Sequence, residues 1–402
     1  MKFLETPSIT APKGFKAQGI SAGLKKSRKK DMAVIISDTP AAAGAVFTLN
    51  KMAAAPVEVC RKNLLSKTAR AIIINSGSAN ACTGSQGLED AFKTTEIAAK
   101  EIGCDKKQIF VSSTGVIGTY LDMEKMEAGI KEVISAASAD GGLNAARAIM
   151  TTDTVEKQSA VSITLDGNET IIAGIAKGSG MIAPNMATML CYVTTDANIT
   201  KNMLQKAVKH SADRSFNLAI VDGDTSTNDT LIVLANGAAG NKAIKSEKEK
   251  NYKIFLEALD TVCIQLAKMM VKDGEGATKF IEIFVQGAQT FEEAKTAAQA
   301  VAKSPLVKTA FFGQDANWGR IVCALGYSGV NLKPERLNVW IENVHIFKNG
   351  TGLKADETVL AEKMKQPEIT LTIDLGRGEA TAKVWTCDFS YNYVKINGDY
   401  RS

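Results

Sequence analysis

Two stretches of the sequence alternate apolar and polar residues on either side of a short glycine-containing turn. The first is Val161–Ile175, in which the alternating segments meet at Asp166–Asn168. In the second, Glu368–Ile373 and Glu379–Trp385 flank Gly376–Gly378. A two-residue period interrupted by a tight turn is typical of a β-hairpin, whose strands run antiparallel. We therefore expect two antiparallel hairpins, which argues against a purely parallel wound sheet.

Segments with helical spacing lie between short apolar runs along the whole chain. Leu88–Ile102, Met123–Ala137 and Ser246–Val271 place apolar residues three to four positions apart, as an amphipathic helix does. Ala71–Asn75 and Gln108–Ser113 are short apolar runs typical of buried strands. Towards the carboxyl terminus we expect mostly strands. The expected fold class is α/β, with helices layered on mixed, largely antiparallel sheets.

Size and charge exclude several classes of protein. The chain has 402 residues, of which 45% are hydrophobic, enough to bury one large core or two ordinary ones. Lys and Arg number 48 and Asp and Glu 43, which leaves a small net charge of +5. The run Lys25–Lys30 (KKSRKK) contains no aromatic residue on which bases could stack, so we interpret it as a solvated loop and expect no nucleic-acid partner. No window is apolar enough to suggest a membrane span.

Cysteine and histidine usage restricts the chemistry. The seven cysteines are an odd number without a C-x-x-C pair, which indicates free thiols in a reducing compartment, and we expect a cytoplasmic protein. The two histidines, His210 and His345, have no cysteine or histidine at metal-ligand spacing. We therefore expect no metal and no cofactor. With so little imidazole, any catalytic base is expected to be another kind of group.

The segment Lys177–Leu190 (KGSGMIAPNMATML) contains the strongest candidate for a nucleophile. In it, the small residue Ala187 precedes Thr188, which opens an apolar run typical of a strand. A threonine hydroxyl is a weak nucleophile, but a threonine that begins a chain can use its own α-amine, with a pKa of about 7.7–8.0, as the base. Attack of the hydroxyl on the preceding carbonyl would create that chain start. Taken by itself, however, a threonine at a strand start is more often a packing residue.

Short sequence blocks along nearly the whole chain support the interpretation of Lys177–Leu190 as a site of chemistry. These blocks and Lys177–Leu190 resemble, in the same order along the chain, the sequences of the bacterial ornithine acetyltransferase family, the glutamate N-acetyltransferases of arginine biosynthesis. The matching blocks are Thr10–Gly19, Asn75–Gly84, Ser112–Gly118, Met150–Thr154, Asp222–Asp229, Asp273–Lys279, Gly313–Arg320 and Tyr393–Ser402.

The resemblance implies a fold and a mode of processing. The family fold is a layered αββα-type sandwich, related to that of self-cleaving aminopeptidases. The resemblance also implies cleavage between Ala187 and Thr188, which gives an α fragment of residues 1–187 and a β fragment of residues 188–402. The two fragments are expected to share one catalytic unit, and two copies of each are expected to assemble. Thr188 is then the residue that accepts the acyl group.

The resemblance also assigns roles to individual side chains. Thr114 and Gly115 match the residues that form the oxyanion hole in the family that the chain resembles. These residue types suit that role, since a hydroxyl and a backbone N–H at a strand exit can donate to the same oxygen. Substrate contacts are implied at Thr151, Thr152, Lys177, Thr188, Glu275, Asn397 and Ser402. Taken without the family, the last three of these would read as a helix-ending turn, a turn and a frayed end. The chain departs from the family in having Ser402 where threonine is usual and Ala316 where proline is common.

The implied reaction is ping-pong transfer of an acetyl group from N2-acetylornithine to glutamate. The sequence does not distinguish whether acetyl-CoA also serves as a donor. A self-cleaving aminopeptidase or amidase, in which water takes the acyl group, is the main alternative. A non-catalytic phosphate or nucleotide binder is a second alternative. Its glycine loops, at Asn75–Gly84 and Lys177–Gly180, match neither the G-x-x-x-x-G-K-[S/T] nor the G-x-G-x-x-G pattern.

Overall fold

The computed structural model describes residues 1–183, 189–354 and 356–399. These residues form two compact units. The first unit includes residues 1–178, 189–217 and 225–270, and the second includes residues 179–183, 218–224 and the described residues from 271 onwards. Within the described part of the chain, no helix is both long and apolar enough to cross a membrane.

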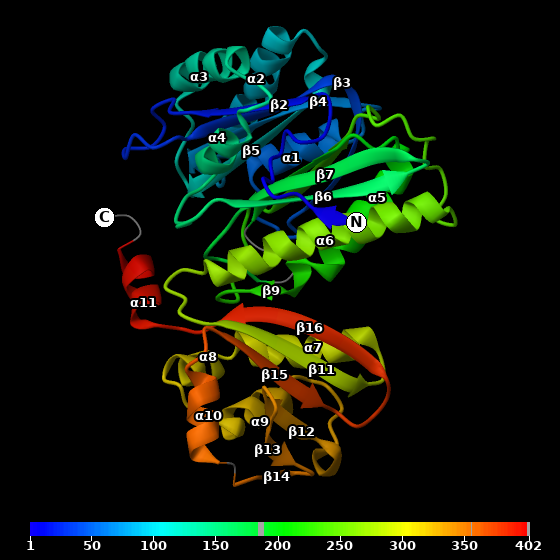
Figure 1. The fold of residues 1–402 in the computed structure, drawn as a ribbon. Coiled ribbons are helices and arrows are strands. Elements are labelled where there is room, and N and C mark those ends of the chain that lie inside the picture. The colour runs from blue at the N-terminus through cyan, green and yellow to red at the C-terminus, as the bar shows by residue number, and fades with distance from the viewer. Residues whose placement is uncertain (184–188, 355, 400–402) are drawn as a thin grey trace. The chain divides into compact units, whose positions relative to one another are not determined.

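The first unit is built on a mixed sheet that has nine strands among the described residues (Figure 1). The strands follow the order β1-β6-β7-β8-β10-β3-β4-β5, and β2 lies beside β3. Parallel pairing joins β4 to β5 and β8 to β10, whereas the other pairs are antiparallel. The mixed, largely antiparallel sheet that the sequence predicts is confirmed. The strands are β1 (Lys2–Phe3), β2 (Phe15–Ile20), β3 (Met32–Phe47), β4 (Ala69–Ser78), β5 (Ile109–Val116), β6 (Lys157–Leu165), β7 (Asn168–Lys177), β8 (Leu190–Thr195) and β10 (Thr230–Ala235).

The long strand β3 belongs to both halves of this sheet. Its first half pairs with β2 and β4, and its second half pairs with β10. The register with β4 shifts between Ile36 and Ala41, on either side of Pro40. Proline cannot donate to the ladder, so it sits at an irregularity where the strand can change direction. The two halves share one hydrophobic core, because Ile175, Tyr192 and the β2–β5 residues belong to the same buried cluster.

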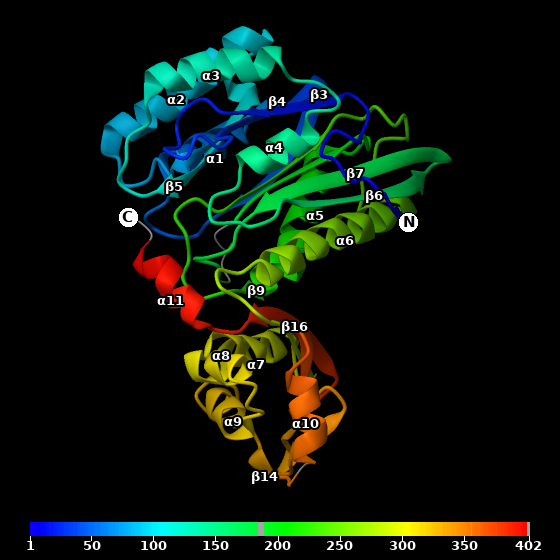
Figure 2. The same ribbon diagram turned by 60° about the vertical axis from the view of Figure 1, so that its left-hand side comes forward.

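Helices cover both sides of the first unit. In Figure 2, α2 and α3 lie next to each other along β4 and β3, while α5 and α6 lie on the side of β6 and β7. Glycines allow these close contacts: a Cβ on Gly44 of β3 would lie 3.0 Å from Val208 of α5, and one on Gly174 of β7 would lie 2.9 Å from Leu266 of α6. The predicted αββα layering is therefore confirmed. The helices are α1 (Ala55–Asn63), α2 (Gly84–Ile102), α3 (Met123–Ser135), α4 (Gly142–Ala148), α5 (Lys201–Arg214) and α6 (Lys250–Lys272).

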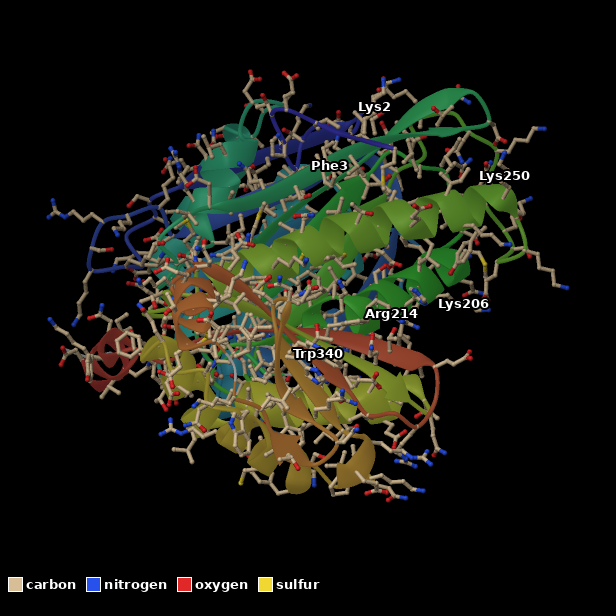
Figure 3. The ribbon with its side chains drawn as sticks, turned by 60° about the horizontal axis from the view of Figure 1, so that its bottom comes forward. Lys2, Phe3, Lys206, Arg214, Lys250 and Trp340 are labelled. Atoms are coloured by element: carbon tan, nitrogen blue, oxygen red, sulfur yellow. The ribbon has the colours of Figure 1, made fainter. Side chains whose placement is uncertain are left out.

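The first predicted hairpin is confirmed. The strands β6 and β7 pair antiparallel along the whole of β6, and the turn between them places Asp166 and Gly167 at φ 50° and 82°. Positive φ at both turn positions is the geometry that matches the twist of two paired strands. The short strand β1 extends this sheet at its edge, where Lys2 and Phe3 are both exposed (Figure 3).

The second unit contains a smaller mixed sheet of seven strands, again counted among the described residues, in the order β14-β13-β12-β15-β11-β16-β9. The helix α7 packs against β16 and β11. The strands are β9 (Ala219–Ile220), β11 (Phe280–Ala288), β12 (Asn338–Ile341), β13 (Val344–Lys348), β14 (Thr351–Gly352), β15 (Glu368–Asp374) and β16 (Ala380–Cys387). The helices are α7 (Phe291–Lys303), α8 (Pro305–Phe312), α9 (Trp318–Gly326), α10 (Glu357–Met364) and α11 (Tyr391–Gly398).

The second predicted hairpin is wrong. Its two strands exist as β15 and β16, but β11 lies between them, parallel to β15 and antiparallel to β16. The glycine-rich connection passes over the end of β11, where Leu375 N donates to Gln286 O at 3.0 Å and Arg377 N donates to Gly287 O at 2.7 Å. A local turn signal does not reveal that a third strand, distant in sequence, fills the space. After α7 the chain contains the five expected strands β12 to β16, but the four helices α8 to α11 lie among them, so strands do not dominate there.

Candidate active site

The exit of β5 brings two backbone segments unusually close together. Thr114 and Gly115 lie opposite Ser76 and Gly77 of β4 in parallel register. Gly115 has φ 131°, and a Cβ at this position would lie only 2.4 Å from the carbonyl carbon of Gly77. No other residue type fits that approach without displacing the backbone. The glycine requirement fits the predicted oxyanion hole, in which backbone N–H groups must stay open to a ligand.

Lys177 lies at the end of β7 and reaches the same strand exit. Its side chain is buried, and Nζ donates to Thr114 Oγ1 at 3.4 Å. Because the ammonium group occupies an acceptor site of this hydroxyl, the hydroxyl proton remains available to donate elsewhere. A cation next to a hydroxyl donor favours negative charge on an oxygen bound there. The structure therefore places Lys177 against Thr114, which precedes Gly115 at this strand exit.

Asp153 organises the backbone on both sides of this lysine. Its Oδ2 accepts from Thr151 N at 3.0 Å, and its Oδ1 accepts from Gly178 N at 2.7 Å. The same Oδ1 accepts from Lys157 Nζ at 2.7 Å, in an ion pair whose side chains are 0% and 1% exposed. Burial alone would raise the pKa of the Asp153 carboxyl, but Lys177 and Lys157 outweigh burial and hold the pKa below its usual value. Asp153 is thus a buried carboxylate that holds the predicted contact residue Thr151 through its amide.

The basic run at residues 25–30 is not a uniformly solvated loop, so that interpretation is wrong for Lys25. Lys26 and Lys29 are exposed, but Lys25 is half-buried and its Nζ donates to Met150 O at 2.7 Å. Burial lowers the pKa of Lys25 to about 8, against the opposing effect of Asp31. A charge run alone does not show which of its members turns inward.

The residues just after the expected cleavage point are held by Asp229. Met189 N donates to Asp229 Oδ1 at 3.1 Å, and the next residue, Leu190, pairs with Lys177 across β7 and β8. Burial raises the pKa of Asp229 well above its usual value, although the Met189 amide opposes this shift. The sequence places it in a family-like block but gives no signal of its role.

The second unit brings together two other predicted contact residues. Glu275 follows α6, and its Oε2 accepts from Nδ2 of Asn397, on α11, at 2.9 Å. Glu275 N also donates to Ser179 O at 2.7 Å, and a Cβ on Gly180 would lie 2.3 Å from the Glu275 carboxylate. Ser179 and Gly180 therefore pack against Glu275, whose carboxylate a larger residue at position 180 would displace. Asn397 lies in the helix α11 and not in the turn that the Asn397–Gly398 pair alone would suggest.

Three of the predicted site residues, Ala187, Thr188 and Ser402, lie outside the described residues. Thr152 follows Thr151 and is half-buried. The two histidines have partners of their own. His210 Nε2 lies 3.4 Å from Asp260 Oδ2. The ring of His345 stacks on the ring of Trp340, which is labelled in Figure 3. Among the described residues, no group of three or more potential metal-ligating side chains is found.

Comparison with known proteins places the chain in a family. The ArgJ family model matches residues 16–402. The arginine biosynthesis bifunctional protein ArgJ of Symbiobacterium thermophilum is 48% identical over 396 residues, which cover 98% of each chain. The Bacillus subtilis protein of the same name is 46% identical over 398 residues, covering 99% of this chain and 97% of its own. The chain belongs to the ArgJ family, as the sequence blocks indicated.

Two solved structures share this name or a related one. A Bacillus halodurans ArgJ chain is 41% identical, covers 46% of this chain and 97% of its own, and has a TM-score of 0.44. An ornithine acetyltransferase from Mycobacterium tuberculosis, solved with ornithine, is 38% identical, covers 47% of this chain and 99% of its own, and also has a TM-score of 0.44.

Proposed function

We propose that this member of the ArgJ family transfers an acetyl group from N2-acetylornithine to glutamate in arginine biosynthesis. Its class is that of an acyltransferase acting on small molecules, in keeping with the family assignment. The observation that carries the proposal is the convergence of Lys177, Thr114 and Gly115 at one strand exit. Met189, the residue after Thr188, is buried, and its neighbour Leu190 pairs with Lys177.

The proposed reaction begins with self-cleavage between Ala187 and Thr188, which produces fragments 1–187 and 188–402. In the first half-reaction, Thr188 Oγ attacks the acetyl carbonyl and its α-amine takes the hydroxyl proton. The developing oxyanion is stabilised by Thr114 Oγ1 and Gly115 N–H. The C–N bond then breaks, ornithine leaves with the proton, and an acetyl ester remains on Thr188.

In the second half-reaction, the amine of glutamate attacks the ester carbonyl, the bond between the acetyl carbon and Thr188 Oγ breaks, and N-acetylglutamate leaves. The proton lost by the attacking amine passes through the α-amine to Thr188 Oγ, which restores the hydroxyl. Both substrates carry an α-carboxylate, so the same cationic and polar groups can serve both in turn. We assign this role to Lys177, Thr151, Thr152 and the hydroxyl of Ser402. Glu275, held by Asn397, is the proposed partner of the distal ammonium group of ornithine. Acetyl-CoA as a second donor fits the word "bifunctional" in the names of the relatives.

The assembly and the location of the protein are further parts of the proposal. We propose that two copies of each fragment form the active enzyme, as the family resemblance implies. We also propose a cytoplasmic location, which the seven free cysteines support.

An assay of the purified protein separates transfer from hydrolysis. With N2-acetylornithine and glutamate together, we expect ornithine and N-acetylglutamate in equal amounts. With N2-acetylornithine alone, we expect no sustained release of acetate, because the acetyl ester on Thr188 reacts with an amine acceptor and not with water. Steady acetate release that does not depend on glutamate would instead identify an amidase and refute the transfer reaction.

Replacing Thr114 with valine is expected to lower kcat by about 10²- to 10³-fold, because one of the two oxyanion donors is lost. Valine has nearly the same shape, so the buried strand exit should keep its packing. Steady-state kinetics with N2-acetylornithine and glutamate measure the effect. The matched control is Thr164→Val at an exposed position of β6, which should leave kcat unchanged. Equal activity of the Thr114→Val and Thr164→Val variants would show that Thr114 does not belong to the oxyanion hole.

A further inference from the structure

The outer edge of β5 is covered by side chains and not by another strand. In the described part of the sheet, β5 is the last strand in the order, so its backbone groups on that side need other partners. Asn63 of α1 donates from Nδ2 to Ile109 O at 2.7 Å. Cys60 Sγ accepts from Val111 N at 3.2 Å and donates to Val111 O at 3.0 Å. The two bonded strand residues are two positions apart, as expected for backbone groups that face the same edge.

Asn228 supplies the next partner along this edge. Its side chain is 6% exposed, and its Nδ2 donates to Ser113 O at 2.8 Å and to Ala79 O at 2.7 Å. Ser113 is two residues beyond the last bonded position and directly precedes Thr114. Asparagine suits this place, because its NH2 group has two donors and a carbonyl oxygen only accepts. Thr227 Oγ1 donates to Asn228 Oδ1 at 2.6 Å, so both ends of the amide group are hydrogen-bonded.

Fixing the Ser113 carbonyl also fixes the direction of the proposed oxyanion donors. Its oxygen belongs to the same planar peptide unit as Thr114 N–H, so it sets the plane from which Thr114 extends. The two-residue alternation of the strand then brings the N–H of Gly115 to the same outer edge. On the other side of the donors, Ala79 N donates to Val116 O at 3.0 Å. One asparagine side chain therefore holds the backbone before and after the two donors.

The residues that follow Asn228 hold the start of β8. Asp229 Oδ1 accepts from Met189 N at 3.1 Å, and Thr230 N donates to Met189 O at 3.0 Å. Met189 directly follows Thr188, the expected nucleophile. Three consecutive residues thus couple the position of the oxyanion strand to the position of the β8 start. Such coupling matters, because a displacement of about 1 Å in an active site can cost about 10²-fold in rate.

We propose that Asn228 is a positioning residue for acetyl transfer, which acts through Thr114 and Gly115 by fixing the peptide unit before them. Donors that are held in place before the reaction stabilise an oxyanion without reorganisation. Loss of the Asn228 amide should therefore slow the chemical step and leave substrate binding largely unchanged. The inference rests on the proposed acetyl transfer, because an oxyanion forms there only when an acyl carbonyl is attacked.

The test compares Asn228→Asp with Asn63→Asp, a matched change at the opposite end of β5. Asn63 is also buried, and its Nδ2 also donates to two carbonyls, those of Lys106 at 3.2 Å and Ile109 at 2.7 Å. Both substitutions keep the side-chain shape and remove two donors, so both should lower the melting temperature. Only Asn228→Asp should lower kcat, by about 10- to 100-fold, with KM for N2-acetylornithine and glutamate changed by less than about threefold.

The kinetic constants are measured at a temperature at which circular dichroism shows both variants folded, and kcat is expressed per mole of chain that begins at Thr188. An equal loss of kcat in both variants would show that the Asn228 amide serves the fold alone, and it would overturn the inference. A rise in KM with unchanged kcat would overturn it too, since Asn228 would then contribute to substrate binding. If Asn228→Asp does not fold, Asn228→Ala, which removes both donors without adding charge, should show the same fall in kcat relative to Asn63→Ala.

A double variant tests whether Asn228 acts through the oxyanion donors. Thr114→Val removes one donor, so less remains for Asn228 to position in that background. The loss of kcat in Thr114→Val/Asn228→Asp should be smaller than the product of the two single losses by at least about threefold. Single losses that simply multiply would show that Asn228 and Thr114 act independently, which contradicts the positioning role.

The outcome of this test is distinct from that of the proposed function. If the wild type transfers acetyl groups and Asn228→Asp has the same kcat as Asn63→Asp, only the role of Asn228 fails. If the wild type transfers none, the proposed function itself fails.

Discussion

The Thr188→Ala variant is expected to remain a single chain of 402 residues and to lose acetyl transfer by about 10⁴-fold or more. Alanine has no hydroxyl, so neither the attack on the Ala187 carbonyl nor the formation of an acetyl ester can occur. Intact mass spectrometry and a denaturing gel measure cleavage, and the transfer assay measures activity. Wild-type protein should instead give fragments that end at Ala187 and begin at Thr188.

Thr188→Ser is the matched control for this prediction. Serine keeps a hydroxyl at the same position, so cleavage should still occur, and activity should fall far less than in the alanine variant. Two fragments in the Thr188→Ala protein would show that the hydroxyl does not perform the cleavage. Full activity in an uncleaved wild-type preparation would refute the role of the free α-amine, because that amine exists only after cleavage.

The sequence predicted most of what depends on local pattern. Helical spacing placed the start of α3 and the end of α2 at the correct residues and their other ends within about four residues, and the turn at Asp166 and Gly167 gave the correct β6–β7 hairpin. Family-like blocks identified Thr114, Gly115 and Lys177, which the structure then brings to one strand exit. These features share a property: each is determined by residues close together in sequence or by a motif that can be matched directly.

What the sequence could not predict depends on contacts between distant segments. The insertion of β11 between β15 and β16 is one case, because the turn between those strands looks like a hairpin whichever strand lies between them. Lys25 is another, since its burial follows from a carbonyl at Met150, far along the chain. Asp153 lay within a matching block, but nothing in MTTDT says that its carboxylate binds two amides and a buried lysine.

Loss of the Asp153 carboxylate is expected to have the largest effect on stability of any single substitution considered for this protein. In Asp153→Leu, the Lys157 ammonium group, only 1% exposed, loses its ion-pair partner, and the amides of Thr151 and Gly178 lose their acceptor. Removing one member of a buried pair costs about 3–5 kcal/mol, because the remaining charge is uncompensated. We therefore expect the free energy of unfolding, measured by urea titration, to fall by about that amount.

The double variant Asp153→Leu/Lys157→Met shows how much of this loss comes from the charge of Lys157. Methionine is close to lysine in length and carries no charge, so the double variant should recover a large part of the stability lost in Asp153→Leu. Activity should not recover with it, because the amides of Thr151 and Gly178 still lack the carboxylate that positions them beside Lys177. If stability does not recover, the unpaired ammonium group is not the cause of the loss. If activity recovers together with stability, Asp153 serves the fold alone and does not position the site.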